Sequence, residues 1–142
     1  MKFINSNYYN GISTVVMEHK GKYFTGIAKL HPDDIDKASE FAGGDLAESR
    51  AVIKALKYER KLLMQEAETC RKFVRACKQQ KKWDNDSSTA KSIYHQLNIK
   101  IKKVNEITDE INKMLSSNER ITMRRDIVLK AIERNRAKKD NL

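Results

Sequence analysis

The sequence predicts an α+β protein that is mostly α-helical, with a small N-terminal antiparallel β-sheet packed on a long antiparallel helical hairpin or coiled coil and a C-terminal helix. Two features predict this fold: all five glycines and the only proline lie in residues 1–44, and heptad spacing of apolar residues begins at residue 45. The composition agrees, because 34% of the 142 residues are charged and only 39% are hydrophobic. An elongated helical protein needs less buried material than a compact sphere, so we expect one elongated domain.

The N-terminal segment has the pattern of a small sheet. Asn10-Gly11 is a strong turn pair, and the β-branched stretch at residues 12–18 predicts a strand. A glycine-containing turn then leads to a returning strand over residues 23–30, and residues 1–4 are a candidate third strand. Because an isolated hairpin is only marginally stable, the sheet must lie against the helices.

From residue 45 onward the apolar residues follow a heptad, which predicts a first long helix over residues 45–83. Its seam residues are Leu46, Ser49, Ile53, Leu56, Arg60, Leu63, Ala67, Cys70, Val74 and Cys77. A cluster of Asp, Asn and Ser residues predicts a turn, after which a second seam predicts a helix over residues 88–116. Its seam residues are Ala90, Tyr94, Leu97, Ile101, Val104, Thr108, Ile111 and Leu115. Two such helices form an antiparallel hairpin.

The C-terminal residues do not continue this seam well. Ser116 and Glu119 have the spacing of a capping box, which predicts a third helix over residues 118–138; one continuous helix is the alternative. Apolar residues that lie off both seams widen the apolar surface beyond what a two-helix hairpin can bury. We therefore expect self-association into at least a dimer.

Positive charge is concentrated in the helices. Residues 1–44 hold five basic and five acidic groups, so the remainder carries the whole net charge of +10. Six cations and no acidic residue lie in residues 71–82, and Trp83 follows directly, with Tyr94 early on the next helix. Cations and a flat ring are what a nucleotide needs. The alternative is that these cations complement the helix dipole and keep the coil soluble.

The sequence offers little that suggests catalysis. The three histidines, His19, His31 and His95, form no metal or nucleophile motif. Cys70 and Cys77 lie one heptad apart on the predicted seam, which indicates core residues and a reducing, intracellular setting. No signal peptide and no membrane span are expected. We therefore expect a protein without enzymatic activity, cofactor or metal.

Gly43-Gly44 leaves two interpretations open. At a helix N-terminus this pair could cradle a phosphate, because the free N–H groups there point outward. Otherwise the two glycines form a flexible loop that enters the first helix.

Two stretches together resemble a known family. Residues 26–34 (GIAKLHPDD) are similar to the strand exit of phage-encoded Thoeris anti-defence proteins of the first type. Gly43-Gly44 followed by Ala47, Arg50 and Ala51 and a long charged helix is similar as well. The resemblance covers nearly the whole chain, because a small sheet packed on extended helices is also that family's architecture.

The resemblance implies a non-enzymatic sponge that binds cyclic ADP-ribose immune signals without cleaving them and so blocks Thoeris immunity. It implies a cytoplasmic homodimer in the host cell, with hexamers and separate sites for cyclic oligonucleotides in some members. Lys29 stands where members have arginine, which keeps the charge but loses the bidentate fork. The predicted ligand-binding residues are Ala28, Lys29, Trp83, Tyr94, Asn98, Arg120 and Arg124.

Two other functions compete with this one. The basic helices also suit a coiled coil that binds nucleic acid, although no dedicated recognition motif is present. A scaffold that only oligomerises is the third interpretation.

Overall fold

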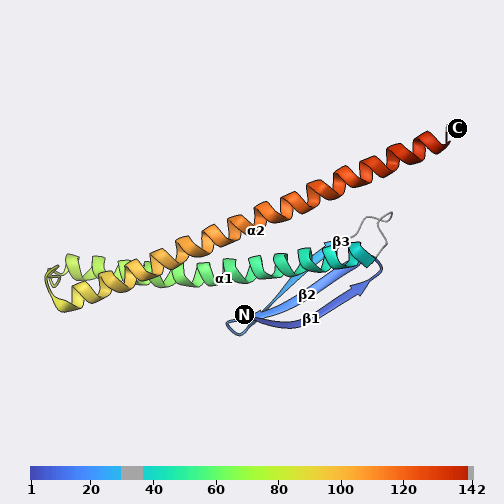
Figure 1. Cartoon of the computed structure of the whole chain (residues 1–142). Coiled ribbons are helices and arrows are strands. Elements are labelled where there is room, and N and C mark those ends of the chain that lie inside the picture. Colours follow the sequence, from blue (N-terminus) through green and yellow to red (C-terminus); the bar gives the residue numbers. More distant parts are fainter. Residues whose placement is uncertain (30–36, 141–142) are drawn as a thin grey trace.

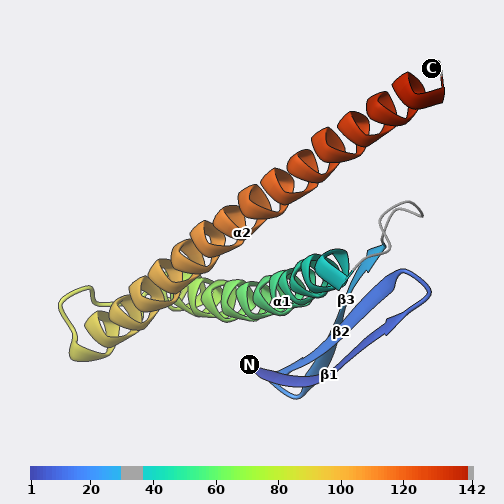
Figure 2. The ribbon, with the colours of Figure 1, turned by 45° about the vertical axis from the view of Figure 1, so that its right-hand side comes forward.

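The computed structural model describes residues 1–29 and 37–140 and has the predicted α+β architecture (Figure 1). Its elements are β1 (Lys2–Tyr9), β2 (Ile12–His19), β3 (Lys22–Lys29), α1 (Lys37–Gln79) and α2 (Ser88–Asp140). The sheet lies against one side of α1, and α2 lies against the other side as the second arm of an antiparallel hairpin (Figures 1 and 2). The predicted fold class is therefore confirmed.

The sheet is an antiparallel meander in the order β1-β2-β3. Both hairpins close through two residues with positive φ: Asn10 and Gly11 at 53° and 78°, and Lys20 and Gly21 at 51° and 76°. Such turns match the right-handed twist of paired strands. The Asn10-Gly11 turn and the third strand are confirmed, and the latter is longer than the predicted residues 1–4.

The first helix begins earlier than predicted. Because α1 starts at Lys37, Gly43 and Gly44 lie inside it, so both the phosphate-cradle and the entry-loop interpretations are wrong. A glycine costs about 1 kcal/mol in a helix interior. Gly43 is buried, and packing of this turn offsets that cost.

The turn between the helices is closed by backbone caps. Lys81 takes a positive φ of 55°, and Lys82 N–H donates to the Cys77 carbonyl at 2.9 Å. These are the features of a Schellman motif, so α1 ends at Gln79 rather than residue 83. Ser87 caps α2, since its Oγ accepts from the backbone N–H of Ala90 at 3.1 Å.

The second helix is continuous from Ser88 to Asp140, so the alternative of a single helix is correct and a separate helix over residues 118–138 is not formed. Serine costs only a few tenths of a kcal/mol in a helix, less than a new start would. Ser49 Oγ donates to Asn118 Oδ1 at 2.9 Å, which ties this part of α2 to α1.

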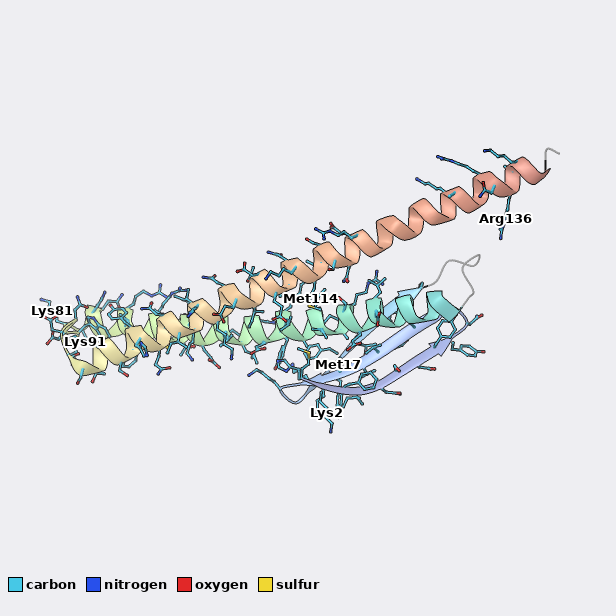
Figure 3. The ribbon with its side chains drawn as sticks, in the orientation of Figure 1. Lys2, Met17, Lys81, Lys91, Met114 and Arg136 are labelled. Atoms are coloured by element: carbon cyan, nitrogen blue, oxygen red, sulfur yellow. The ribbon has the colours of Figure 1, made fainter. Side chains whose placement is uncertain are left out.

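Helix α1 is buried on two opposite faces. One cluster joins it to the sheet, and a second joins it to α2; Val52 packs against both. The sheet cluster comprises Val15, Met17, Ala28, Leu46, Ala47 and Ala51. The helix cluster comprises Ile53, Leu56, Ile107 and Ile111. In Figure 3, Met17 marks the first layer and Met114, which packs against the helix cluster, marks the second.

Sheet and helix approach each other closely at Gly26. Ala47 and Ala51 of α1 are fully buried beneath it. A Cβ at Gly26 would overlap the carbonyl oxygen of Ala47 and the amide nitrogen of Ala51. Glycine is therefore required here because the two backbones meet without a side chain between them.

Polar residues of the predicted seams face each other across the two helices. Arg60 donates to Thr108 Oγ1 at 3.2 Å, as Ser49 does to Asn118. Further along, Lys100 forms a 3.0 Å ion pair with Glu66. These contacts are spread along the hairpin and help to define the register of α1 against α2.

Glu59 connects all three layers. His19 Nε2, at the end of β2, lies 2.9 Å from Glu59 Oε2, and Lys103 Nζ of α2 lies 3.5 Å from Glu59 Oε1. Burial acts to raise the pKa of this carboxyl. The hydrogen bond from His19 and the charges of His19, Lys103 and Lys20 outweigh burial, so the pKa of Glu59 is lowered.

The end of α2 lies away from the other elements. Figure 2 shows this arm diverging from α1 toward the C-terminus, where Arg136 marks the projecting part in Figure 3. All described side chains beyond residue 129 are exposed. These exposed side chains gain little from packing within one chain, and an isolated helix of this length is only marginally stable.

We predict that Gly26→Ala lowers the free energy of unfolding by about 3 kcal/mol or more, because α1 and β3 must separate. Gly44→Ala is the matched control: a Cβ there meets no atom within 4 Å. It should raise stability by about 0.5–1 kcal/mol, as expected for alanine in a helix. Urea unfolding followed by circular dichroism measures both. A Gly26→Ala protein as stable as wild type would contradict the close contact.

We predict that Glu59→Gln lowers the free energy of unfolding by about 1–3 kcal/mol at neutral pH. Because the pKa of Glu59 is lowered on folding, its contribution is full above the ordinary value of 4.5 and is lost as the pH falls through the folded-state pKa. The difference between the two proteins should therefore shrink in acid.

Urea titrations between pH 7 and pH 3 measure this difference. The control is Glu68→Gln, since Glu68 is exposed and its ion pairs contribute little. It should stay within about 0.5 kcal/mol of wild type at every pH. A loss for Glu59→Gln that does not change with pH would show that the charge of Glu59 does not stabilise the fold.

Candidate functional site

A large cavity lies where the edge of the sheet, α1 and α2 meet. It has a volume of about 700 Å³, within the range of small-molecule sites. We call it the sheet-end groove. Its lining residues are Ile27 of β3, Arg50, Ile53, Lys54 and Lys57 of α1, and Leu115, Asn118 and Glu119 of α2.

Helix α1 places three cations along this groove. Arg50, Lys54 and Lys57 follow one another at steps of four and three, so they share one side of the helix. That side lies between the face covered by the sheet and the face covered by α2. The groove therefore has a basic floor between two packed layers.

Two of these cations are fixed by the edge of β3. Arg50 Nη1 donates to the Ile27 carbonyl at 2.6 Å, and Lys54 Nζ donates to the Thr25 carbonyl at 2.7 Å. These bonds satisfy edge carbonyls that would otherwise be open to another strand. A guanidinium has five N–H donors and an ammonium three, so both groups retain donors for an anion.

The walls of the groove are apolar. Ile27 and Leu115 are 46% and 40% exposed, although both are large aliphatic side chains. Glu119 is the only acidic residue among the lining residues, against three cations. The groove thus combines an excess of two positive charges with apolar surface, which suits an anion that also has an apolar part.

A second cavity lies near the tip of the hairpin. It measures about 360 Å³ and is lined by Glu68, Arg71, Val74, Arg75, Lys78, Tyr94 and Leu97. We call it the tip pocket. Val74 is buried, whereas the cations are exposed.

The predicted aromatic pair is present beside the tip pocket. The rings of Trp83 and Tyr94 meet edge to face, with centroids 5.6 Å apart and planes at 88°. The indole Nε1–H of Trp83 donates to Asn85 Oδ1 at 2.7 Å, so Trp83 also holds the turn. Tyr94 itself lines the cavity.

The structure does not bring all predicted ligand residues together within one chain. Ala28 packs with Ala47 near the start of α1, whereas Trp83 follows its last residue, Gln79. At about 1.5 Å per residue, this is roughly 48 Å along the helix. Ala28 is also only 2% exposed, so its side chain cannot present a surface to a ligand.

The remaining predicted residues divide between the same two ends. Lys29 ends β3 two residues after Ile27 of the sheet-end groove, whereas exposed Arg120 lines a separate cavity on α2, with Asn112, Lys113, Ser116 and Ser117. Asn98 is exposed on α2 one residue after Leu97 of the tip pocket. The side chain of Arg124 lies outside the described residues.

Lys54 and Lys57 were not among the predicted ligand residues, and Arg50 entered only through the family resemblance. The sequence did contain a signal for this set. Arg50, Lys54 and Lys57 have the spacing of one helix face, and residues 50–57 include no acidic residue. Spacing alone could not show that the sheet edge and α2 would enclose them.

The structure describes no further chemical centre. Within residues 1–29 and 37–140, no three His, Cys, Asp or Glu side chains are grouped so as to hold a metal ion. Cys70 and Cys77 are free thiols and half-buried. Neither described helix has an apolar stretch long enough to cross a bilayer.

Comparison of the chain with protein-family models, with characterised proteins and with solved structures finds no match. The resemblance to Thoeris anti-defence proteins therefore stays a hypothesis that rests on the residues quoted above.

Proposed function

We propose that the protein binds a small phosphorylated nucleotide in the sheet-end groove and sequesters it without cleaving it. The observation that supports this proposal is the set of three cations on the floor of an apolar groove between β3, α1 and α2. Cyclic ADP-ribose-type signals are the specific ligand class we propose, following the family resemblance. Binding of such a signal would block Thoeris immunity in the host cell.

The charge of the groove suits such a ligand. A pyrophosphate linkage has two negative charges, and the lining residues have an excess of two positive ones. Arg50 and Lys54 are already held by strand carbonyls, so little side-chain freedom is lost when they meet a phosphate. Charge-assisted hydrogen bonds to phosphate are stronger than neutral ones.

The apolar walls supply the second part of the affinity. Ile27, Ile53 and Leu115 offer aliphatic surface on which a base or ribose can be buried. Among the described residues that line the groove there is no aromatic ring, so none of them fills the stacking role predicted for Trp83.

Self-association is part of this proposal. The exposed C-terminal part of α2 and half-exposed Leu115 lie on the same arm. A second copy packed along this arm would cover the described side chains beyond residue 129, all of which are exposed in one chain. A dimer is the smallest assembly that does this, and a hexamer is the larger one expected from the resemblance.

We predict that cyclic ADP-ribose isomers bind the wild-type protein and that Lys57→Glu weakens binding at least tenfold, because the groove loses its net positive charge. Lys57 is exposed and forms no hydrogen bond or ion pair with another described side chain, so the variant should remain folded. Lys102→Glu, an equal charge change at an exposed position of α2, is the matched control and should bind as wild type does.

Isothermal calorimetry measures both affinities, and chromatography of the ligand released by heating tests its integrity. Intact ligand is expected. Absence of binding for every isomer would refute the proposed ligand class, and recovery of a hydrolysed product would refute sequestration without cleavage.

We predict that light scattering after size-exclusion chromatography gives at least the mass of a dimer. A chain shortened after residue 118 should be monomeric yet folded, because both core clusters and their packed neighbours lie before that residue. Circular dichroism checks its fold. A full-length monomer would contradict the proposed association along α2.

A further inference from the structure

We infer that α1 bears a second binding surface, a cationic stripe that takes single-stranded nucleic acid along its length. Nine positions from residue 50 to residue 78 follow one another at alternating steps of four and three, so they form one continuous row on the helix. The row comprises Arg50, Lys54, Lys57, Lys61, Met64, Glu68, Arg71, Arg75 and Lys78. Seven of the nine are cations, and all seven are exposed.

The length of the stripe exceeds that of any small ligand. Its ends are 28 residues apart, which is about 42 Å along the helix axis. The sheet-end groove opens at one end of this row and the tip pocket at the other. A linear polyanion can contact the whole row, whereas one mononucleotide or cyclic dinucleotide can occupy only one end.

Charge on α1 is separated between its sides. Glu59 and Glu66 lie off the stripe and are matched by groups of the packed layers: His19 and Lys103 at Glu59, and Lys100 at Glu66. Among the described side chains of β3 and α2, Glu119 at the groove is the one acidic group placed beside the stripe. The net positive charge of this side of the helix is therefore directed to solvent.

One carboxylate interrupts the stripe. Glu68 Oε1 lies 2.7 Å from Arg75, and Glu68 Oε2 lies 3.9 Å from Arg71. All three side chains are 45% exposed or more, so these ion pairs are weak. A phosphate can replace the carboxylate as the partner of both arginines, whose guanidinium groups suit bidentate contact.

The surroundings favour a single strand over a duplex. A single strand places its phosphates on a cationic track and turns its bases onto apolar or aromatic surface. The tip pocket provides such a surface, with Tyr94, Val74 and Leu97 beneath the cations. A duplex turns its bases inward and winds each backbone away from a straight row, so it meets fewer of the cations.

An anionic membrane is the competing partner for any basic helix. Membrane-binding helices alternate cations with a broad apolar face that enters the lipid. Met64 is the only apolar residue of the stripe, so the stripe itself lacks such a face. Nucleic acid is therefore the partner that the residues favour.

The test measures binding of the full chain to a fluorescein-labelled oligothymidine of ~12 nucleotides, a length within the range of known single-strand sites. Fluorescence anisotropy is recorded over a series of salt concentrations. The logarithm of the association constant should fall linearly with the logarithm of the salt concentration. The expected slope is about −3 to −5, because counterions are released from four to seven phosphates. A duplex of equal length should bind at least tenfold more weakly.

A double variant at the tip half of the stripe, Arg71→Ala with Lys78→Ala, should weaken oligothymidine binding about tenfold and reduce the slope by about 1.4. The control pair, Lys102→Ala with Lys113→Ala, removes two exposed cations of α2 that lie off the stripe and should stay within twofold of wild type. The fluorescence of Trp83, the only tryptophan, should respond to oligothymidine because its ring touches Tyr94.

The outcomes separate this inference from the proposed function, because the tip variant leaves the sheet-end groove intact. Loss of oligothymidine binding with unchanged binding of cyclic ADP-ribose supports two distinct surfaces. Equal losses for the tip and control variants, a duplex that binds as tightly as the single strand, or binding to phosphatidylserine vesicles without binding to oligothymidine would each overturn the inference.

Discussion

The backbone contact between β3 and α1 at Gly26 is the constraint on which the rest of the structure depends. Because no side chain separates Gly26 from Ala47 and Ala51, the strand edge lies close enough for Arg50 to reach the Ile27 carbonyl. A wider spacing would remove that hydrogen bond and open the groove at its floor. Packing of two backbones therefore decides where the cations of the candidate site are held.

The same contact makes α1 the shared wall of two hydrophobic layers. Ala47 and Ala51 face the sheet beneath Gly26, and Leu46 packs beside them, whereas Ile53 and Leu56 face α2. With both of these sides covered, Glu59 and Glu66 lie on one of the two narrow sides that remain, and the cationic stripe lies on the other. Acidic Glu59 and Glu66 lie toward groups that neutralise them, whereas the cations lie toward solvent. The charge separation follows from the layer arrangement.

Both proposed binding surfaces would recognise phosphate groups, the groove in one small ligand and the stripe in a polymer. The sheet-end groove is enclosed by three elements and suits a compact ligand, because its fixed cations and apolar walls are close together. The full stripe is open and suits a chain of phosphates. A nucleotide in the groove and a polymer on the stripe would meet at Arg50, Lys54 and Lys57, so the two ligands would compete there. The tip pocket lies beyond that overlap.

The sequence by itself determined the features that depend on local pattern: the Asn10-Gly11 turn, most of the two heptad seams and the turn before α2. The second seam was wrong at two positions, because Ile107, off the predicted seam, is buried and Leu115, on it, is 40% exposed. Even the polar seam positions Ser49 and Arg60 meet polar partners of the second helix, since helical periodicity places them there. Only the tertiary structure decided that Gly43-Gly44 is helical, that Trp83 lies far from Ala28, and which side of α1 the sheet covers. Those features depend on contacts between residues that are distant in sequence. The packing energy of such contacts exceeds the local conformational preference of the residues, and the contacts leave no periodic pattern in the sequence.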